Sequence, residues 1–136
     1  MSAVTGWAVA QGLKTLIHAM FTKKFEPERL IGSGGMPSSH AATVCAMATA
    51  TEILYGVGSF EFAVAAILAI VVMHDAMNVR LETGKQAKLL NEMIDLVKKL
   101  DGKPLTEERL KEFVGHTPVQ VLVGALIGVL IGWLMV

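Results

Sequence analysis

The chain alternates between long apolar runs and shorter polar segments. Residues 38–56, 59–79 and 117–136 are nearly free of Lys and Arg, and each run has the ~20 residues that a helix needs to cross a bilayer. Residues 3–21 form a fourth apolar run with a single basic residue, Lys14. The pattern predicts an all-α integral membrane bundle of about four transmembrane helices, organised as a single membrane domain over residues 1–136.

Polar residues at the ends of these runs predict where the helices begin. Ser38 and Ser59 precede apolar runs as N-cap residues, and Thr117 is followed by a proline in the first turn of the last helix. The insertion 80–115 contains an amphipathic helix that the segment DGKP at 101–104 ends, with a short charged helix expected after Thr106. Its helical spacing places Ala87, Leu90, Ile94 and Val97 on one face and Lys88, Glu92, Asp95 and Lys99 on the other. We expect the amphipathic helix to lie along the membrane interface or to cover the site described below.

The distribution of basic residues predicts a topology. Eleven of the twelve Lys and Arg residues lie in segments 22–37 and 80–115, which share one side of the membrane if all four apolar runs span it. The positive-inside rule makes that side cytoplasmic and places both termini outside. We therefore expect a protein of the bacterial plasma membrane, or its equivalent, with a functional site on the cytoplasmic side.

Composition supports this assignment. Of the 136 residues 53% are hydrophobic and 18% are charged, and the mean hydropathy is +0.55. A water-soluble domain of this size could not bury so much apolar surface. The formal net charge of zero identifies no partner, and we expect none among nucleic acids. Cys45 is the single cysteine, which excludes an internal disulfide, and no removable signal peptide is expected at the N-terminus.

Three polar residues interrupt the first apolar run. Gln11, Lys14 and His18 fall on one face of the predicted helix. They form a polar seam within a bundle, or else Lys14 reaches a functional site. His18 alone is best explained as a structural histidine.

The stretch SGGMPSSHAATV, residues 33–44, collects residues suited to an anion. Gly34 and Gly35 allow a loop whose backbone N–H groups close on a phosphate. Ser38 and Ser39 place hydroxyls beside the unpaired amides at a helix start, where the helix dipole favours negative charge. For the serines alone, ordinary helix capping is the favoured explanation, but the combination with His40 in the first turn favours a function.

The predicted topology brings His116, in GHTPVQVLVGALIG, to the same membrane face as His40. An ionisable side chain at a membrane boundary is often functional. Gln120 lies one turn further on, and Gly124, Gly128 and Gly132 continue its stripe. Glycines at this spacing indicate close helix packing, inside one chain or between two. We favour a homodimer.

The segments GGMPSSHAA, HDAMNVRLETGKQAKLLNEM and GHTPVQVLVGALIG together resemble the divergent branch of the phosphatidic acid phosphatase and vanadium haloperoxidase superfamily. Pro37-Ser38-Ser39-His40 is similar to its P-S-G-H segment, which implies that His40 is the general acid. His116 is similar to its nucleophilic histidine, and Arg80 to the arginine that precedes it. Lys23 and Arg29 resemble an opening Lys and Arg-Pro pair loosely, and Lys14 is the rival for the lysine.

The chain departs from the wider family in three ways. Gln120 stands where an aspartate would orient His116, and Asp75 could replace that carboxylate or simply pair with Arg80. Roughly thirty residues separate Arg80 from His116, where the family has a short spacing. The wider family generally has six spans, and this chain has room for four.

The resemblance implies metal-independent hydrolysis of a lipid phosphate or pyrophosphate, without a cofactor. His116 would attack phosphorus to form a phosphohistidine, and His40 would protonate the leaving oxygen. Arg80, a lysine and the amides of 34–39 would stabilise the phosphate oxygens. The expected partners are membrane lipids and a phosphorylated lipid or small phosphate. The alternative is a non-catalytic phospholipid-headgroup or phosphate-binding protein, or a transport component, which the missing aspartate favours.

Overall fold

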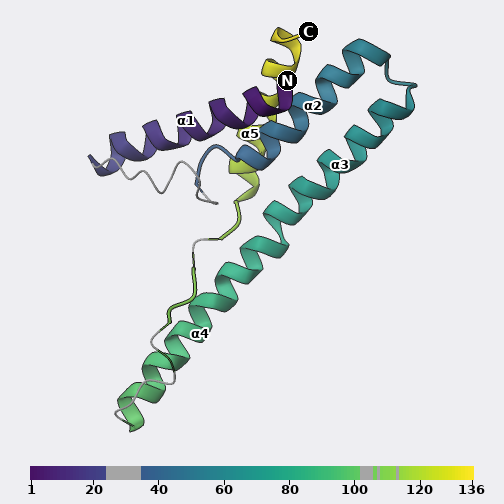
Figure 1. Cartoon of the computed structure of the whole chain (residues 1–136). Coiled ribbons are helices and arrows are strands. Elements are labelled where there is room, and N and C mark those ends of the chain that lie inside the picture. Colours follow the sequence, from purple (N-terminus) through teal and green to yellow (C-terminus); the bar gives the residue numbers. More distant parts are fainter. Residues whose placement is uncertain (24–34, 102–105, 107, 113) are drawn as a thin grey trace.

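The computed structural model describes residues 1–23, 35–101, 106, 108–112 and 114–136, and the regular structure in these residues is entirely helical. The helices are α1 (Ser2–Thr22), α2 (Ser39–Tyr55), α3 (Phe60–Met77), α4 (Val79–Asp101) and α5 (Pro118–Leu134). Helices α1, α2, α3 and α5 pack together, and α4 extends away from them (Figure 1). The all-α prediction is confirmed.

The predicted N-caps are confirmed, because each of the three residues accepts a hydrogen bond from its own helix. Ser38 Oγ accepts from the N–H of Ala41 at 3.4 Å, and Ser59 Oγ accepts from the N–H of Phe62 at 3.1 Å. Thr117 forms a reciprocal capping box with Gln120, whose Oε1 accepts from the Thr117 N–H at 3.1 Å. These local bonds hold the helix starts at the residues that the sequence predicts.

Helix α2 lies at the centre of the bundle, and α5 packs parallel to it through its glycines. A Cβ added to Gly128 would lie 2.5 Å from the carbonyl oxygen of Ala42, and one added to Gly124 would overlap the carbonyl of Ser38. Gly132 meets Ala46 in the same way, one turn further along both helices. The glycine stripe therefore packs inside one chain, so it no longer supports the predicted homodimer, which stays a prediction.

Helices α1 and α3 both run antiparallel to α2. Gly6 of α1 packs against Ala42, and on α3 Ala76 packs near Ala41 while Met73 lies 3.8 Å, sulfur to sulfur, from Cys45. The start of α2, the end of α3 and the start of α5 consequently meet at one end of the bundle. Both chain termini lie at the other end (Figure 1). This end-to-end arrangement places His40 and His116 together.

The bundle buries small residues and exposes large apolar ones. Ala41, Ala42 and Ala46 are fully buried, whereas Ile67 is 63% exposed and Leu126 is 63% exposed. Close packing through small residues, with large apolar side chains outward, is typical of helices that face lipid. By length and composition one described helical stretch, Phe60–Leu100, qualifies as membrane-spanning, and Pro118–Leu134 is apolar but shorter. The four-span count stays a prediction.

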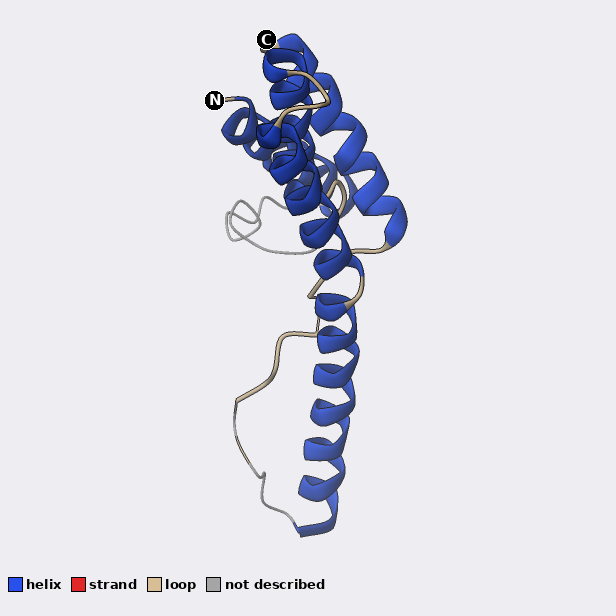
Figure 2. Cartoon of the chain, turned by 90° about the vertical axis from the view of Figure 1, so that its right-hand side faces the viewer, coloured by secondary structure: helices blue, strands red, loops and turns tan. Residues whose placement is uncertain are grey.

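Helix α4 continues almost directly from α3 and projects beyond the bundle, and a non-helical return segment (residues 108–112 and 114–116) runs back toward α5 (Figure 2). The amphipathic helix is confirmed, but only its first turns approach the site, and its Gly84–Asn91 face meets the return segment.

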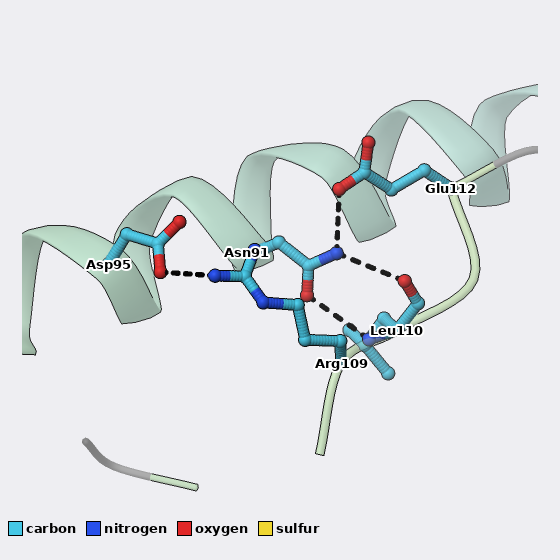
Figure 3. Close-up of polar contacts among 5 residues, drawn as sticks. All are labelled: Asn91, Asp95, Arg109, Leu110 and Glu112. Atoms are coloured by element: carbon cyan, nitrogen blue, oxygen red, sulfur yellow. Dashed lines mark hydrogen bonds and ion pairs between the residues drawn. The ribbon is translucent and has the colours of Figure 1, made fainter. Parts of the chain in front are cut away.

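The short charged helix predicted after Thr106 is wrong, because residues 106 and 108–112 are not helical. Asn91 explains the difference: its side chain bonds both the N–H and the C=O of Leu110, at 3.1 and 3.0 Å (Figure 3). Arg109 pairs with Asp95 of α4 at 2.6 Å. The backbone groups of Leu110 are thus bonded to α4 and not to a helical turn of their own.

Candidate active site

Two imidazoles meet where the helix ends converge. His40 lies in the first turn of α2, His116 directly precedes the N-cap of α5, and their ring centroids are 5.7 Å apart at an interplanar angle of 63°. The parallel packing of α2 and α5 causes this approach, because it puts the two helix starts side by side. Their juxtaposition is what the sequence predicts from the topology.

Two hydrogen bonds hold His116. Its backbone N–H donates to the carbonyl of Ala76 at 2.9 Å, and its Nδ1 lies 3.1 Å from the carbonyl oxygen of Gly35. A carbonyl can only accept, so Nδ1 carries the proton and the neutral ring has its lone pair on Nε2. Nε2 is buried and has no hydrogen-bond partner among the described residues. The ring thus keeps a buried, unprotonated nitrogen.

The surroundings of His116 keep it neutral. Burial lowers its pKa below the usual value, and the positive charges of Lys14 and His40 lower the pKa further. The Gln120 side chain and the Gly35 carbonyl act in the opposite direction. A neutral imidazole near pH 7 is the form that a nucleophilic histidine requires.

Lys14 reaches this site from α1. Its side chain is only 3% exposed, and its Cγ and Cδ pack beside Gly35, 3.7 Å from the position that a Cβ would take there. Its charge acts on both His40 and His116. Lys23, by contrast, is exposed at the C-terminal end of α1. Of the candidate lysines, Lys14 is therefore the one brought to the histidines.

Arg80 and Asp75 form an ion pair at the edge of the site. Arg80 Nε donates to Asp75 Oδ2 at 2.6 Å, and the two side chains are 43% and 39% exposed. The charges of both residues act on His40. Asp75 does not take the orienting place on His116, since Nδ1 of that ring already donates to Gly35.

The two ends of the insertion between Arg80 and His116 lie close together. Gly115 has φ +90°, a backbone conformation that favours glycine, and a Cβ at this position would lie 2.6 Å from the carbonyl carbon of Arg80. Arg80 and His116 are therefore neighbours in space despite their separation in sequence. The departure in spacing does not disrupt the site.

The serines and Gln120 build the scaffold around the histidines. Ser38 is fully buried, its hydroxyl caps α2, and its N–H donates to the backbone carbonyl of Gln120 at 3.0 Å. Ser39 is also buried. The capping explanation therefore holds for Ser38. Both helix starts still direct their positive dipole ends toward the histidines.

Sequence reasoning identified both histidines but missed how His116 is held. The group that accepts the hydrogen bond from His116 Nδ1 is the backbone carbonyl of Gly35. Every residue has such a carbonyl, so the residue type does not reveal this contact. Gly35 itself was predicted for its N–H, as part of a phosphate loop. Gly34 and Arg29, the remaining predicted binding residues, lie outside the described part of the chain.

Comparison with known proteins identifies the family of this chain. A family model described as the Divergent PAP2 family matches residues 1–131. The chain is 34% identical over 140 residues to the uncharacterized membrane protein YuiD of Bacillus subtilis (strain 168), an alignment that covers 96% of this chain and 89% of that relative. No solved structure matches the chain. The chain therefore belongs to the Divergent PAP2 family.

Proposed function

We propose that this protein is a membrane-embedded phosphatase that hydrolyses a lipid phosphate or pyrophosphate through a phosphohistidine on His116, without a metal. Helices α1, α2, α3 and α5 cross a plasma membrane in this proposal, with both termini outside and the histidines at the cytoplasmic side. The outward-facing large apolar side chains support the membrane location, as does the description of the Bacillus relative as a membrane protein.

The observation that carries the proposal is the state of the His116 ring. Its Nδ1 proton is held by a carbonyl, its Nε2 lone pair has no partner among the described residues, and a second imidazole lies 5.7 Å away. A histidine that serves only packing would not need a buried ring nitrogen without a partner beside a second imidazole. A nucleophile beside a general acid requires this arrangement.

The chemistry follows from the placement of these groups. His116 Nε2 attacks phosphorus while the bond from phosphorus to the leaving oxygen breaks, and His40 gives that oxygen its proton. Water then attacks the phosphohistidine, His40 accepts a proton from it, and inorganic phosphate leaves with His116 restored. Lys14, Arg80 and the positive ends of α2 and α5 stabilise the phosphoryl oxygens, where positioning and charge provide most of the catalysis.

A second candidate function is phosphate or phospholipid-headgroup binding without turnover. The observation in its favour is that a neutral carbonyl, not a carboxylate, holds Nδ1 of His116. An imidazolium leaving group in the second half of the reaction would lack the charge that an aspartate supplies. The same cations and helix ends would then retain an anion without cleaving it.

Phosphate release from a panel of lipid monophosphates and diphosphates in detergent micelles tests the proposal. We expect turnover by the wild type, its loss in His116→Ala, and an acid-labile phosphoenzyme in the wild type alone. The matched control is His74→Ala, which removes an exposed histidine of α3 and should leave the rate unchanged. Turnover that survives in His116→Ala would end the proposal. Tight phosphate binding without turnover would select the second candidate.

A further inference from the structure

A cavity of about 340 Å³ adjoins His116 on the side of α4. Gly115 and Thr117, the sequence neighbours of His116, line this cavity, and so does Gly35, whose carbonyl holds the imidazole. The steps described above do not use it. The cavity therefore lies next to the segment that carries His116.

The far walls of the cavity are held in place by specific contacts. They come from the first turns of α4 and from the return segment, which Asn91 ties together (Figure 3). Asn91 is 3% exposed, and besides its two bonds to Leu110 it donates to Glu112 Oε1 at 2.8 Å. A Cβ at Gly84 would lie 2.5 Å from the carbonyl oxygen of Glu112. These contacts fix the positions of the cavity walls.

The charge around the cavity favours an anion. Lys85 and Lys88, one turn apart on α4, both line it, and with the carboxylate of Glu112 they give its described lining a net charge of +1. Each has an exposed partner, Glu82 at 2.6 Å and Glu92 at 4.0 Å respectively. Exposed pairs of this kind contribute about 1 kcal/mol or less, so an incoming anion can displace them. The start of α5 at Thr117 adds the positive end of a helix dipole.

A smaller cavity of about 160 Å³ shares Gly35 with the larger one. Its other lining residues come from α1, where they are Lys14, Ile17, His18 and Phe21, and from Met36. Because the carbonyl of Gly35 holds the His116 ring, both cavities lie near the candidate site.

We infer that the larger cavity binds a second anionic group of the substrate, of the chemical class of a second phosphate, and that Lys85 and Lys88 select such substrates over monophosphates. This inference rests on the proposed phosphatase function. The second phosphate could belong to a lipid diphosphate or to free pyrophosphate, which share the same chemistry.

Matched substrates test the selectivity. The full-length protein in detergent is assayed with farnesyl diphosphate, farnesyl monophosphate and inorganic pyrophosphate. We expect the double variant Lys85→Gln/Lys88→Gln to lose about tenfold or more in kcat/KM for the lipid diphosphate and to stay within about twofold for the monophosphate. The control Lys98→Gln/Lys99→Gln removes the same charge from the distal end of α4 and should change neither rate. Turnover of free pyrophosphate comparable to that of the lipid diphosphate would identify a soluble substrate.

A binding measurement separates failure of this inference from failure of the proposed function. Calorimetry with the His116→Ala protein compares pyrophosphate with phosphate, and the Lys85/Lys88 variant should weaken pyrophosphate binding alone. If the wild type hydrolyses nothing, the proposed function fails and this measurement decides the subsite. Equal losses for mono- and diphosphate, or equal losses in the distal-lysine control, would overturn the inference.

Discussion

Nδ1 of His116 lies 3.1 Å from the carbonyl oxygen of Gly35, a residue 81 positions earlier in the chain. The contact fixes the neutral tautomer of the ring, as an aspartate would, but it brings no negative charge to stabilise the imidazolium. Burial and the charge of Lys14 act in the same direction, because both lower the pKa of His116. The site therefore favours the neutral nucleophile.

The lowered pKa of His116 predicts that activity is lost at acidic pH. It also predicts that the charge of Lys14 affects the pH at which the loss occurs. His116 is neutral when the pH is well above its pKa, and it becomes protonated as the pH falls through that pKa. The wild-type rate should therefore fall only below pH ~6.5, the ordinary pKa of histidine. Replacing Lys14 by Met removes a charge that lowers this pKa, which moves the acid limb to higher pH. A pH–rate profile and a histidine NMR titration measure the shift. Lys23→Met, at an exposed position, is the control. A limb that stays in place or moves to lower pH in Lys14→Met contradicts the prediction.

A second prediction separates the roles of the two histidines. His40→Ala should lower hydrolysis of an alkyl phosphate by about 10²–10⁴-fold, the usual contribution of a general acid. With p-nitrophenyl phosphate the leaving group departs without a proton, so the same variant should release one rapid equivalent of nitrophenolate before slow turnover. Rapid-mixing kinetics measures this burst. An absent burst, with equal losses for both substrates, would mean that His40 does not protonate the leaving oxygen.

The parts of this structure that depend on neighbouring residues could be predicted from sequence. Ser38, Ser59 and Thr117 begin their helices because capping involves only residues within one turn. The meeting of His40 and His116 follows from counting the apolar helices between their segments, because successive helices run in opposite directions. The orienting role of Gly35 could not be predicted, since it depends on a backbone oxygen and a contact between distant segments.

The return segment is a second part of the structure that depends on contacts between distant residues and so could not be predicted from sequence. Thr106 does accept a hydrogen bond from the N–H of Glu108 at 3.1 Å, as at a helix start, yet no helix follows in the described residues. Local signals favoured a helix there, and the long-range bonds of Asn91 to Leu110 outweighed them. The proximity of Arg80 and His116 depends on the same fold-back, which the number of intervening residues cannot reveal.

A third prediction concerns the glycine stripe. Gly128→Ala should destabilise the fold by about 1–3 kcal/mol, because the new methyl group meets the backbone of Ala42. Gly12→Ala is the matched control, since a Cβ there meets nothing within 4 Å. It should stabilise α1 by about 0.5–1 kcal/mol. Thermal unfolding in detergent measures both changes. If Gly128→Ala instead dissociates a dimer without loss of folding, the glycines form an interface between two chains.

The last prediction concerns how the return segment delivers His116 to the site. Asn91→Ala removes three hydrogen bonds between α4 and the return segment, and a hydrogen bond of this kind contributes about 0.5–1.5 kcal/mol. We expect faster hydrogen–deuterium exchange in residues 108–116 and a loss of phosphatase activity, because His116 follows directly from this segment. Arg109→Gln breaks only the exposed pair with Asp95, which is worth about 1 kcal/mol or less, and should leave both exchange and activity near wild type. Unchanged exchange in Asn91→Ala would show that the glycine contacts at Gly84 and Gly115 suffice to hold the segment, and that Asn91 does not position the nucleophile.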